Sequence, residues 1–132
     1  MVLGIVDADH FKVINDRYGH AAGDGTLKDL AVLLGSGIRE GDLVGRWGGE
    51  EFLVLLRHCG LEDGKKRFIT LVDLVDRGPW TNAELAVTIS IGVASLVPQE
   101  DGSPEQLIKR ADESLYRAKE TGRNRVVLYA GG

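Results

Sequence analysis

A pair of adjacent glycines, Gly48 and Gly49, separates two short apolar segments at residues 43–47 and 52–56. Two strand-like segments joined in this way predict a β-hairpin, whose tight turn uses backbone angles that glycine adopts at little cost. Two glutamates follow the glycines at once, at the mouth of the second strand, where packing does not call for charge. A purely structural explanation stays open at this point, because Gly-Gly hairpins with acidic edges are common.

The length and composition predict one globular domain. At 132 residues the chain is large enough to bury a core without disulfides or a structural metal. Its net charge of −4 argues against a general nucleic-acid binder, which usually carries a basic excess. A nucleotide enzyme stays possible, because a few local cations suffice for it. Cys59 is the only cysteine, which excludes an internal disulfide and favours a reducing compartment.

Hydropathy gives no sign of membrane insertion. No apolar run is long enough to cross a bilayer, and Met1 leads into a strand-like segment rather than a basic leader. We therefore expect a cytoplasmic protein. If the full-length protein is tethered to a membrane, another segment must provide the tether.

Strand-like and helix-like segments alternate along the chain, with one adjacent pair of strands at the hairpin. This order predicts an α/β (α+β) fold, a mixed central sheet with packed helices in the palm or ferredoxin-like style, formed by residues 1–132 as a single domain. Besides the hairpin, we expect strands at 2–6, at 85–96 with an interruption near Gly92, and at 125–129; helices from Asp9 to Asn15, at 26–38, at 61–75 and from Pro104 to Gly122; and a loop at 19–25.

Asp7 comes at the carboxyl end of the first predicted strand, where open α/β sheets place their ligands. If that strand pairs beside the hairpin, Asp7 and Glu50 converge on one point. Such a pair suits Mg²⁺, which takes few protein oxygens and completes its octahedron with water and substrate phosphate. Two ions in such a site can clamp both oxygens of a phosphoryl transfer. Taken alone, Asp7 is equally well explained as a helix cap or turn acid.

Several spaced motifs extend over almost the whole chain. The first is Asp-Ala-Asp-His-Phe-Lys-Val-Ile-Asn-Asp at 7–16, and further motifs follow in the order Gly19-His20, Gly23-Asp24, Leu27, Gly48-Gly49-Glu50-Glu51-Phe52, Ala111-Asp112, Leu115-Tyr116, Ala118-Lys119 and Gly122-Arg123-Asn124. Together they resemble the GGDEF family of diguanylate cyclases. The resemblance implies an enzyme that joins two GTP molecules into cyclic di-GMP and releases two pyrophosphates.

The resemblance also implies roles for individual residues. Asp7, the backbone carbonyl of Ala8, and Glu50 would bind Mg²⁺ (or Mn²⁺). Glu51 would help to deprotonate the attacking 3′-hydroxyl or complete the metal shell. Residues that would contact the substrate are the amides near His10 and Phe11 at a helix start, the cations Lys12, Lys119 and Arg123, the guanine-binding Asn15 and Asp24, and the turn glycines Gly48 and Gly49.

Two of these assignments rest on chemistry that can be weighed separately. A carboxylate at Asp24 would accept from the ring N–H and the exocyclic amine that guanine offers and adenine does not. Lys119 and Arg123 lie four residues apart near a predicted helix end. Cations are favoured at that position by the helix dipole, so a solvated helix face also explains them.

A further pattern, Arg39-Glu40-Gly41-Asp42, precedes the Gly-Gly turn and resembles the family's inhibitory product site. Arginine offers a planar fork to phosphate and guanine, and the carboxylate of Asp42 would pair with the guanine edge. We therefore expect feedback inhibition by cyclic di-GMP. Since the chain has one set of site residues and the product needs two linkages, we expect a homodimer in catalysis.

The chain also departs from the family pattern. Family members usually begin with a helix carrying Asp-x-Leu-Thr-Gly-Leu-x-Asn-Arg, and neither that helix nor an upstream regulatory or sensor domain occurs in this sequence. Three alternatives remain: a non-catalytic domain that binds GTP or cyclic di-GMP, a nucleotide cyclase with another base preference, and a palm-type polymerase. No basic groove for a nucleic-acid template is visible, which argues against the polymerase.

Overall fold

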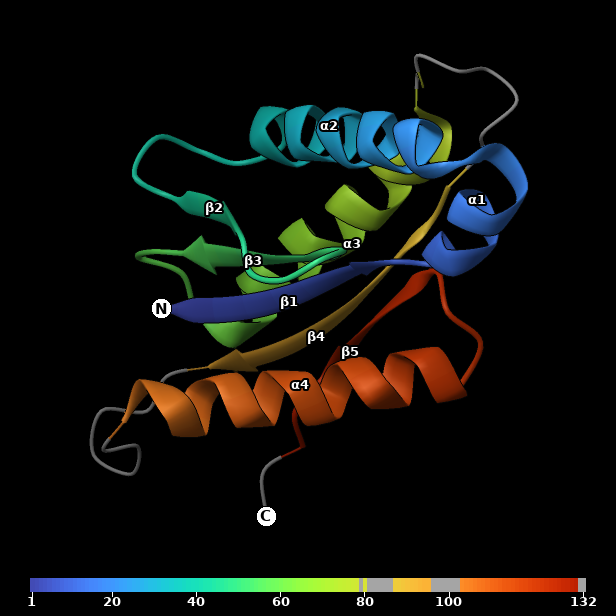
Figure 1. Ribbon diagram of the computed structural model, residues 1–132. Coiled ribbons are helices and arrows are strands. Elements are labelled where there is room, and N and C mark those ends of the chain that lie inside the picture. The colour runs from blue at the N-terminus through green and yellow to red at the C-terminus, as the bar shows by residue number, and fades with distance from the viewer. Residues whose placement is uncertain (79, 81–86, 96–102, 131–132) are drawn as a thin grey trace.

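A mixed five-stranded sheet forms the centre of the computed structural model, which describes residues 1–78, 80, 87–95 and 103–130 (Figure 1). The strand order is β2-β3-β1-β4-β5; β4 and β5 are parallel and the other neighbours antiparallel. This arrangement confirms the predicted mixed sheet with packed helices. The strands are β1 (Val2–Ala8), β2 (Leu43–Arg46), β3 (Glu51–Leu56), β4 (Ile89–Ser95) and β5 (Arg125–Leu128); the helices are α1 (Phe11–Tyr18), α2 (His20–Ser36), α3 (Leu61–Arg77) and α4 (Pro104–Glu120).

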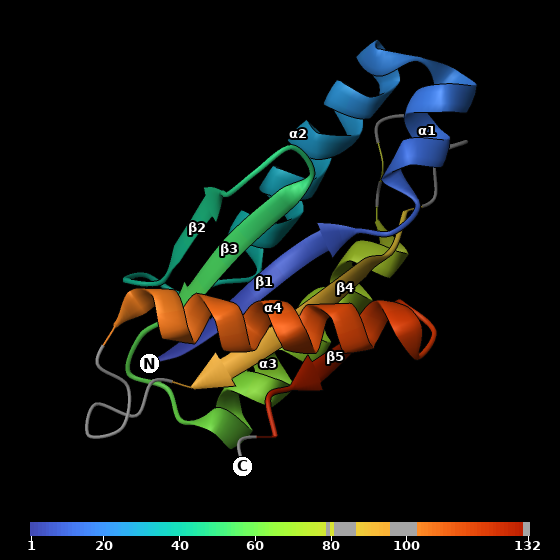
Figure 2. The ribbon, with the colours of Figure 1, turned by 60° about the horizontal axis from the view of Figure 1, so that its bottom comes forward.

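Helices cover both faces of the sheet, α2 and α3 on one side and α4 on the other (Figures 1 and 2). Alternate residues of the central strand β1 therefore enter two separate cores. Val2 and Val6 pack with the α2 and α3 side, whereas Leu3 and Ile5 pack with the buried side chains of α4. Because β1 is buried on both faces, it is apolar almost throughout, and the buried carboxylate of Asp7 comes one residue before its end.

The predicted hairpin is present as β2 and β3, joined through residues 47–50. The backbone N–H groups of Trp47 and Gly48 both donate to the carbonyl of Glu51. The conformational reason given for the glycines is wrong, because neither Gly48 nor Gly49 is among the described residues with positive φ. A Cβ at either position would meet nothing within 4 Å. Both glycines therefore leave open space beside the backbone of the turn.

The predicted loop at 19–25 is wrong, because α2 begins at His20 and a single residue, Gly19, separates it from α1. Gly19 has a φ of 91° and ends α1 by donating its N–H to the carbonyl of Asn15. The glycines of this segment favoured a loop, yet Gly23 is buried on the same face of α2 as Leu27 and Leu30. Helix α2 therefore starts six residues, nearly two turns, earlier than predicted.

Two other expectations change in detail. Asp9 does not cap α1: the N-cap is His10 with a φ of 56° and no side-chain cap. β4 runs without interruption through Gly92 from Ile89 to Ser95, and the ends of the predicted strand at 85–86 and 96 lie outside the described residues. The predicted start of α4 is confirmed, since the Ser103 hydroxyl accepts from the Gln106 N–H.

Within residues 1–78, 80, 87–95 and 103–130, no helix combines the length and the apolar character that crossing a membrane requires.

Candidate functional site

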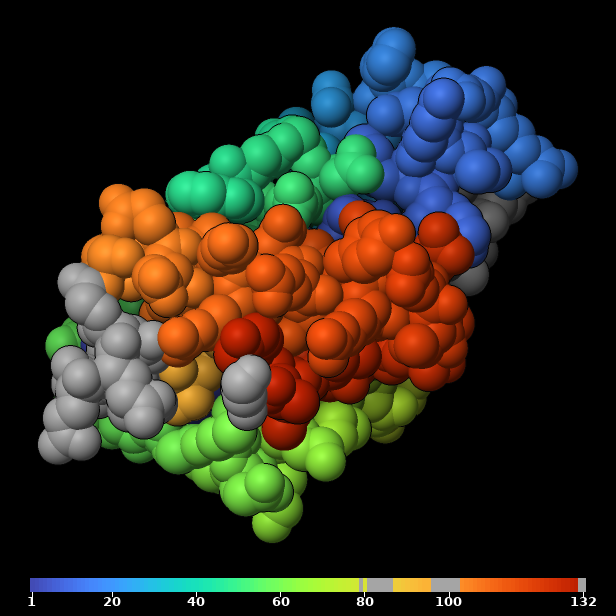
Figure 3. Space-filling model, turned by 90° about the horizontal axis from the view of Figure 1, so that it is seen from below, coloured from blue at the N-terminus to red at the C-terminus, as the bar shows by residue number. Residues whose placement is uncertain are grey.

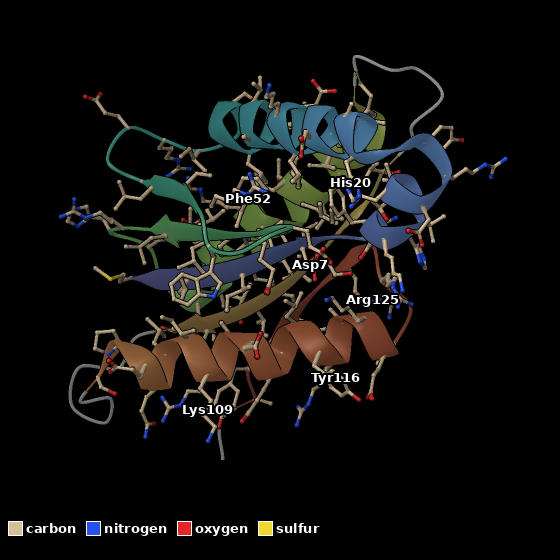
Figure 4. The ribbon with its side chains drawn as sticks, viewed as in Figure 1. Asp7, His20, Phe52, Lys109, Tyr116 and Arg125 are labelled. Atoms are coloured by element: carbon tan, nitrogen blue, oxygen red, sulfur yellow. The ribbon has the colours of Figure 1, made fainter. Side chains whose placement is uncertain are left out.

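The register between β1 and β3 sets Asp7 directly opposite Glu51. Opposed residues of an antiparallel pair point to the same side of the sheet, and here that side faces α4. Glu50 lies one residue earlier, at the end of the turn. Figure 4 shows Asp7 between the end of β1 and α4, with Phe52 on the opposite side toward α2. The predicted meeting of acids from two distant parts of the chain is thus built into strand pairing.

Lys119 of α4 reaches this point and forms an ion pair with Oδ2 of Asp7. The Asp7 side chain is 4% exposed and that of Lys119 is 36% exposed, so the pair connects a buried anion to a solvent-accessible cation. Lys119 is therefore not a freely solvated helix residue.

The pKa values of the carboxyl groups of Asp7, Glu50 and Glu51 are all raised above their usual values. Burial raises the pKa of Asp7, and Lys119 only partly offsets that rise. Burial also raises the pKa of Glu50, with a further rise from the negative charge of Asp7. The pKa of Glu51 is raised by burial first, and then by Asp7 and by Asp112 of α4. A site with this electrostatic character favours the binding of an additional cation.

One oxygen atom of this carboxylate cluster lacks a hydrogen-bond donor. Oδ1 of Asp7 is buried and has no hydrogen-bond partner. A buried unpaired oxygen is costly, and in native proteins it calls for an explanation such as an ion. No three His, Cys, Asp or Glu side chains of the described residues come close enough to hold a metal by themselves. Carboxylate oxygens are donors that suit an ion such as Mg²⁺, which takes few protein oxygens and obtains the others from water and phosphate.

Arg46, which the sequence analysis did not single out, holds the turn that carries the glutamates. Its guanidinium donates to the carbonyl of Gly48 at 3.3 Å and to that of Gly49 at 2.6 and 3.2 Å. These bonds fix the backbone just ahead of Glu50. The position of an arginine immediately before a Gly-rich turn is the signal from which this role could have been predicted.

Two hollows flank the hairpin. The larger, about 670 Å³, lies between α2 and the hairpin, and Asp24, Lys28, Arg46 and Phe52 are among its lining residues. The smaller, about 490 Å³, lies on the α4 side. Figure 3, which views the molecule from below, shows α4 crossing this face with the hairpin along one edge. The second hollow is lined by Trp47, Glu51, Glu105, Ile108, Lys109 and Asp112.

Asn15 and Asp24, the predicted guanine contacts, come from α1 and α2. Asp24 is exposed and lines the larger hollow. Asn15 packs across the helix pair against the neighbouring Gly23: a Cβ on Gly23 would stand 1.8 Å from Oδ1 of Asn15. Gly23 thus permits a close approach that brings the Asn15 amide beside the turn of α2 that bears Asp24.

The other predicted phosphate contacts gather at the start of α1. Ala8 is the last residue of β1, His10 and Lys12 are exposed, and the Phe11 ring is buried. The first N–H groups of a helix have no intrahelical partner, so those of α1 remain suited to an anion. Phe11 therefore acts through packing as a side chain, and any contact with phosphate would come from its backbone.

Arg123 lies in the loop between α4 and β5, and its positive charge lowers the pKa of Asp7, as that of Lys119 does. The loop is held by Asp9, a residue the sequence analysis had assigned to helix capping. Oδ2 of the Asp9 carboxylate accepts from the backbone N–H of Asn124 at 3.0 Å. The local sequence does not predict this hydrogen bond, because Asp9 and Asn124 are 115 residues apart.

Arg39 and Asp42 lie between α2 and β2, away from the carboxylate cluster. The Asp42 carboxylate is bound by the protein itself: it forms an ion pair with Arg67 at 2.6 Å and accepts from the N–H groups of Arg39 and Arg57. Burial alone would raise the pKa of Asp42, but these donors outweigh it and hold the pKa below its usual value.

The chain matches a known protein family over most of its length. The family model described as "Diguanylate cyclase, GGDEF domain" matches residues 1–125. The chain belongs to the GGDEF domain family. It is 48% identical over 124 residues to the uncharacterized protein YhcK of Bacillus subtilis, covering 92% of this chain and 34% of that protein. It is 41% identical over 127 residues to the probable diguanylate cyclase DgcT of Escherichia coli, covering 94% of this chain and 28% of DgcT.

Solved GGDEF domains have the same fold. The active GGEEF domain of a diguanylate cyclase from Vibrio cholerae superimposes with a TM-score of 0.90 at 33% identity, covering 99% of this chain and 83% of that one. The GGDEF domain of DgcB from Caulobacter crescentus, in complex with c-di-GMP, gives a TM-score of 0.88 at 30% identity, covering 98% of this chain and 78% of that one.

Proposed function

We propose that this GGDEF domain is a diguanylate cyclase that condenses two GTP molecules into cyclic di-GMP. The observation that carries the proposal is the buried Asp7 oxygen without a hydrogen-bond partner, set beside Glu50 and Glu51 at the mouth of the hairpin. A receptor that only binds a nucleotide has no need for three carboxyl groups whose ionisation the fold opposes. The proposed unit is the 132-residue chain as one catalytic domain.

Asp7, the carbonyl of Ala8, and Glu50 would hold Mg²⁺ or Mn²⁺, with Glu51 beside them. Bound there, the ion would neutralise charge on the triphosphate and make the α-phosphate more electrophilic. The unpaired Oδ1 of Asp7 and the raised pKa values of the cluster support this assignment. The Lys119 ammonium would then move from Asp7 toward the phosphates.

The guanine base would occupy the hollow beside α2, where Asp24 accepts from the ring N–H and the exocyclic amine, and Asn15 bonds to the base edge. The open space beside Gly48 and Gly49 leaves room for the phosphates to lie against the turn backbone. The start of α1, with the N–H groups of His10 and Phe11 and the charge of Lys12, would bind the phosphates together with Lys119 and Arg123.

The chemical step needs two domains. The 3′-hydroxyl of one GTP attacks the α-phosphate of the other; the new P–O bond forms as pyrophosphate leaves, and Glu51 accepts the hydroxyl proton. A chain with one nucleotide site cannot align two such reactions by itself, so we propose a homodimer in which each domain presents its GTP to the other. Alignment of this kind can supply much of the acceleration. An upstream regulatory or sensor domain would promote the pairing.

We also propose that cyclic di-GMP inhibits the enzyme at Arg39 and Asp42. Arg39 is exposed, and its planar guanidinium can receive a phosphate or guanine. A carboxylate has about four acceptor positions, and three donors already occupy those of Asp42. A guanine would therefore have to donate to the remaining acceptor position of the Asp42 carboxylate. The complex of the related DgcB domain with c-di-GMP supports a product-binding surface in this family.

The test is incubation of the protein with GTP and Mg²⁺, followed by chromatographic identification of the product. We expect cyclic di-GMP from the native protein and about a thousandfold less from Glu51→Gln. The rate per enzyme should rise with protein concentration until the dimer is fully formed. A rate strictly proportional to concentration far below dimerisation would overturn the paired mechanism. GTP binding without any product would favour a non-catalytic receptor instead.

A further inference from the structure

Asp9 is a buried carboxylate whose bonds reach three parts of the chain. Its side chain accepts from the hydroxyls of Thr88 and Ser90, each at 2.6 Å, and from the backbone N–H of Asn124 at 3.0 Å. Its own N–H donates to the carbonyl of Thr88 at 2.9 Å. Asp9 is 5% exposed and Ser90 is fully buried. The carboxylate thus joins the end of β1, the start of β4 and the loop that follows α4.

That loop has an unusual backbone. Three consecutive residues, Gly122, Arg123 and Asn124, have positive φ values of 133°, 61° and 48°. Left-handed conformations are disfavoured for residues with a side chain and persist where surrounding contacts impose them. Two contacts do so here: the N–H of Arg123 donates to the carbonyl of Ala118 at 2.9 Å, and the N–H of Asn124 donates to Asp9.

The consequence concerns the direction of Arg123. Its backbone is fixed on one side by the end of α4 and on the other by Asp9. Asn124, the next residue, is bonded to Asp9, which follows the last residue of β1, so the loop is tied to the end of the strand that carries Asp7. An arginine on a loop of fixed conformation loses less freedom when it binds a phosphate than an arginine on a mobile loop. Asp9 therefore supports the cation at the carboxylate cluster without touching a ligand.

Asp9 lies two residues from Asp7, so a direct role in metal binding has to be considered. Its hydrogen bonds argue against that role. A carboxylate has about four acceptor positions, and three of those of Asp9 are taken by protein donors. Asp7, by contrast, has an unpaired buried oxygen. The two acids therefore have different roles: Asp7 has an oxygen available to a ligand, whereas Asp9 is bonded to other parts of the protein.

We propose that Asp9 is a positioning residue for the reaction: it holds the 122–124 loop in the left-handed conformation that directs Arg123 to the triphosphate. Thr88 and Ser90 act with it by fixing the carboxylate. This inference rests on the proposed function, because the assignment of Arg123 to the triphosphate belongs to that proposal.

Two kinds of variant test the proposal. Asp9→Ala removes both acceptor oxygens, and with them the bond to the Asn124 N–H, and should release the loop. Thr88→Val removes one hydroxyl at constant shape, and its matched control, Thr88→Ser, keeps the hydroxyl. The matched control is Asp76→Ala, which removes the carboxylate of an exposed residue of α3. The probe is 3′-deoxy-GTP with Mg²⁺, which lacks the attacking hydroxyl and cannot be condensed.

Loss of a residue that orients a ligand typically costs about 10- to 100-fold in affinity. We expect Asp9→Ala to weaken 3′-deoxy-GTP binding by about tenfold and Thr88→Val to weaken it by a smaller factor. Thr88→Ser and Asp76→Ala should stay close to the native protein. If Asp9 acts through Arg123, the effect of Asp9→Ala should nearly vanish in an Arg123→Ala background. An equal loss in both backgrounds would overturn the proposal.

Amide hydrogen exchange at Asn124 gives a readout that does not depend on nucleotide binding. We expect faster exchange in Asp9→Ala and native exchange in Asp76→Ala. If Asn124 exchanges at the native rate in Asp9→Ala, Asp9 does not hold the loop and the inference fails. If instead the native protein binds no 3′-deoxy-GTP while Asn124 responds as expected, the proposed function fails and the loop contact stands.

Discussion

Lys119 binds one oxygen of the Asp7 carboxylate, while the other oxygen of the same group is buried without a partner. The two residues are 112 positions apart and meet because α4 packs across the end of β1. One oxygen of the carboxylate is thus paired with Lys119, and the other is available to a further cation. A lysine ammonium and a metal ion compete for one anion, so their occupancies should be linked.

Removing the Lys119 charge should therefore have opposite effects on two ligands. In nucleotide-free protein, Lys119→Met should bind Mn²⁺ about fivefold more tightly, as expected for the loss of one partly exposed charge worth ~1 kcal/mol. The same variant should bind GTP more weakly, because a phosphate contact is lost. Titration followed by electron paramagnetic resonance of free Mn²⁺ measures the first effect, with Lys119→Arg as the charge-retaining control. Unchanged Mn²⁺ affinity would show that the ion binds elsewhere.

The raised pKa values of the cluster predict how stability depends on pH. Because burial raises the pKa of Glu51 in the folded protein, the folded state binds its proton more tightly than the unfolded chain. The free energy of unfolding should then fall as pH rises from the ordinary value of 4.5 through the raised value. Glu51→Gln removes this contribution, so the variant should be more stable than the native protein at pH 7 without divalent ions.

Urea denaturation in the presence of a chelator, at pH 4.5 and at pH 7, measures this difference. The gain of Glu51→Gln should be present at pH 7 and small at the lower pH. Asp42 provides an internal contrast, since its pKa is lowered and its contribution to stability is lost on acidification instead. A gain of equal size at both pH values would mean that packing rather than charge repulsion is responsible.

Gly23 offers a test of guanine recognition. A methyl group there would meet Oδ1 of Asn15 at 1.8 Å, so Gly23→Ala must displace the Asn15 amide. We expect the KM for GTP to rise about tenfold with little change in kcat, because binding rather than chemistry is affected. Gly25→Ala is the matched control on the same helix: its Cβ would meet nothing within 4 Å, and the helix should gain ~1 kcal/mol. Equal KM values for the two variants would contradict the role of Asn15.

Variants of Arg67 and Arg39 should separate two effects, the loss of stability and the loss of inhibition by the product. The Asp42 side chain is 4% exposed and that of Arg67 is 11% exposed. Removing one partner of a buried pair typically costs about 3 kcal/mol, so Arg67→Met should lower the midpoint of thermal unfolding substantially. Arg39→Ala should leave stability unchanged and relieve inhibition by added cyclic di-GMP. Calorimetry and inhibition assays on the same samples distinguish the two, and full inhibition of Arg39→Ala would exclude that site.

Much of the fold followed from periodicity, because α3, α4 and the hairpin carry complete local patterns. The carboxylate cluster was predictable as well, since Asp7 and the turn acids needed only adjacent strands to meet. Asp9 was not, because its bonds to Thr88, Ser90 and Asn124 join residues 79, 81 and 115 positions apart. Local sequence reports local structure, and these contacts depend on how β4 and the loop after α4 are brought to the end of β1.

Glycine was the residue type that misled most often, and Gly92 shows why. A glycine inside a strand pattern indicates either an interruption or a close approach of other backbone, and the sequence does not distinguish them. Here β4 is continuous, and the reason for glycine is α4: a Cβ at position 92 would lie 2.1 Å from the Ala111 carbonyl oxygen and from the Leu115 nitrogen. These are backbone atoms of a helix, which cannot move aside separately.

Gly92→Ala should therefore push α4 away from the sheet. Overpacking of this kind typically costs about 3 kcal/mol, and the displacement would also carry Lys119 away from Asp7. We expect a lower midpoint in urea denaturation together with weaker GTP binding. Gly45→Ala in β2, where a Cβ would meet nothing within 4 Å, provides the control for a methyl group added to a strand. If Gly92→Ala unfolds at the same urea concentration as Gly45→Ala, the contact between α4 and β4 is looser than described, and with it the geometry that brings Lys119 to the carboxylate.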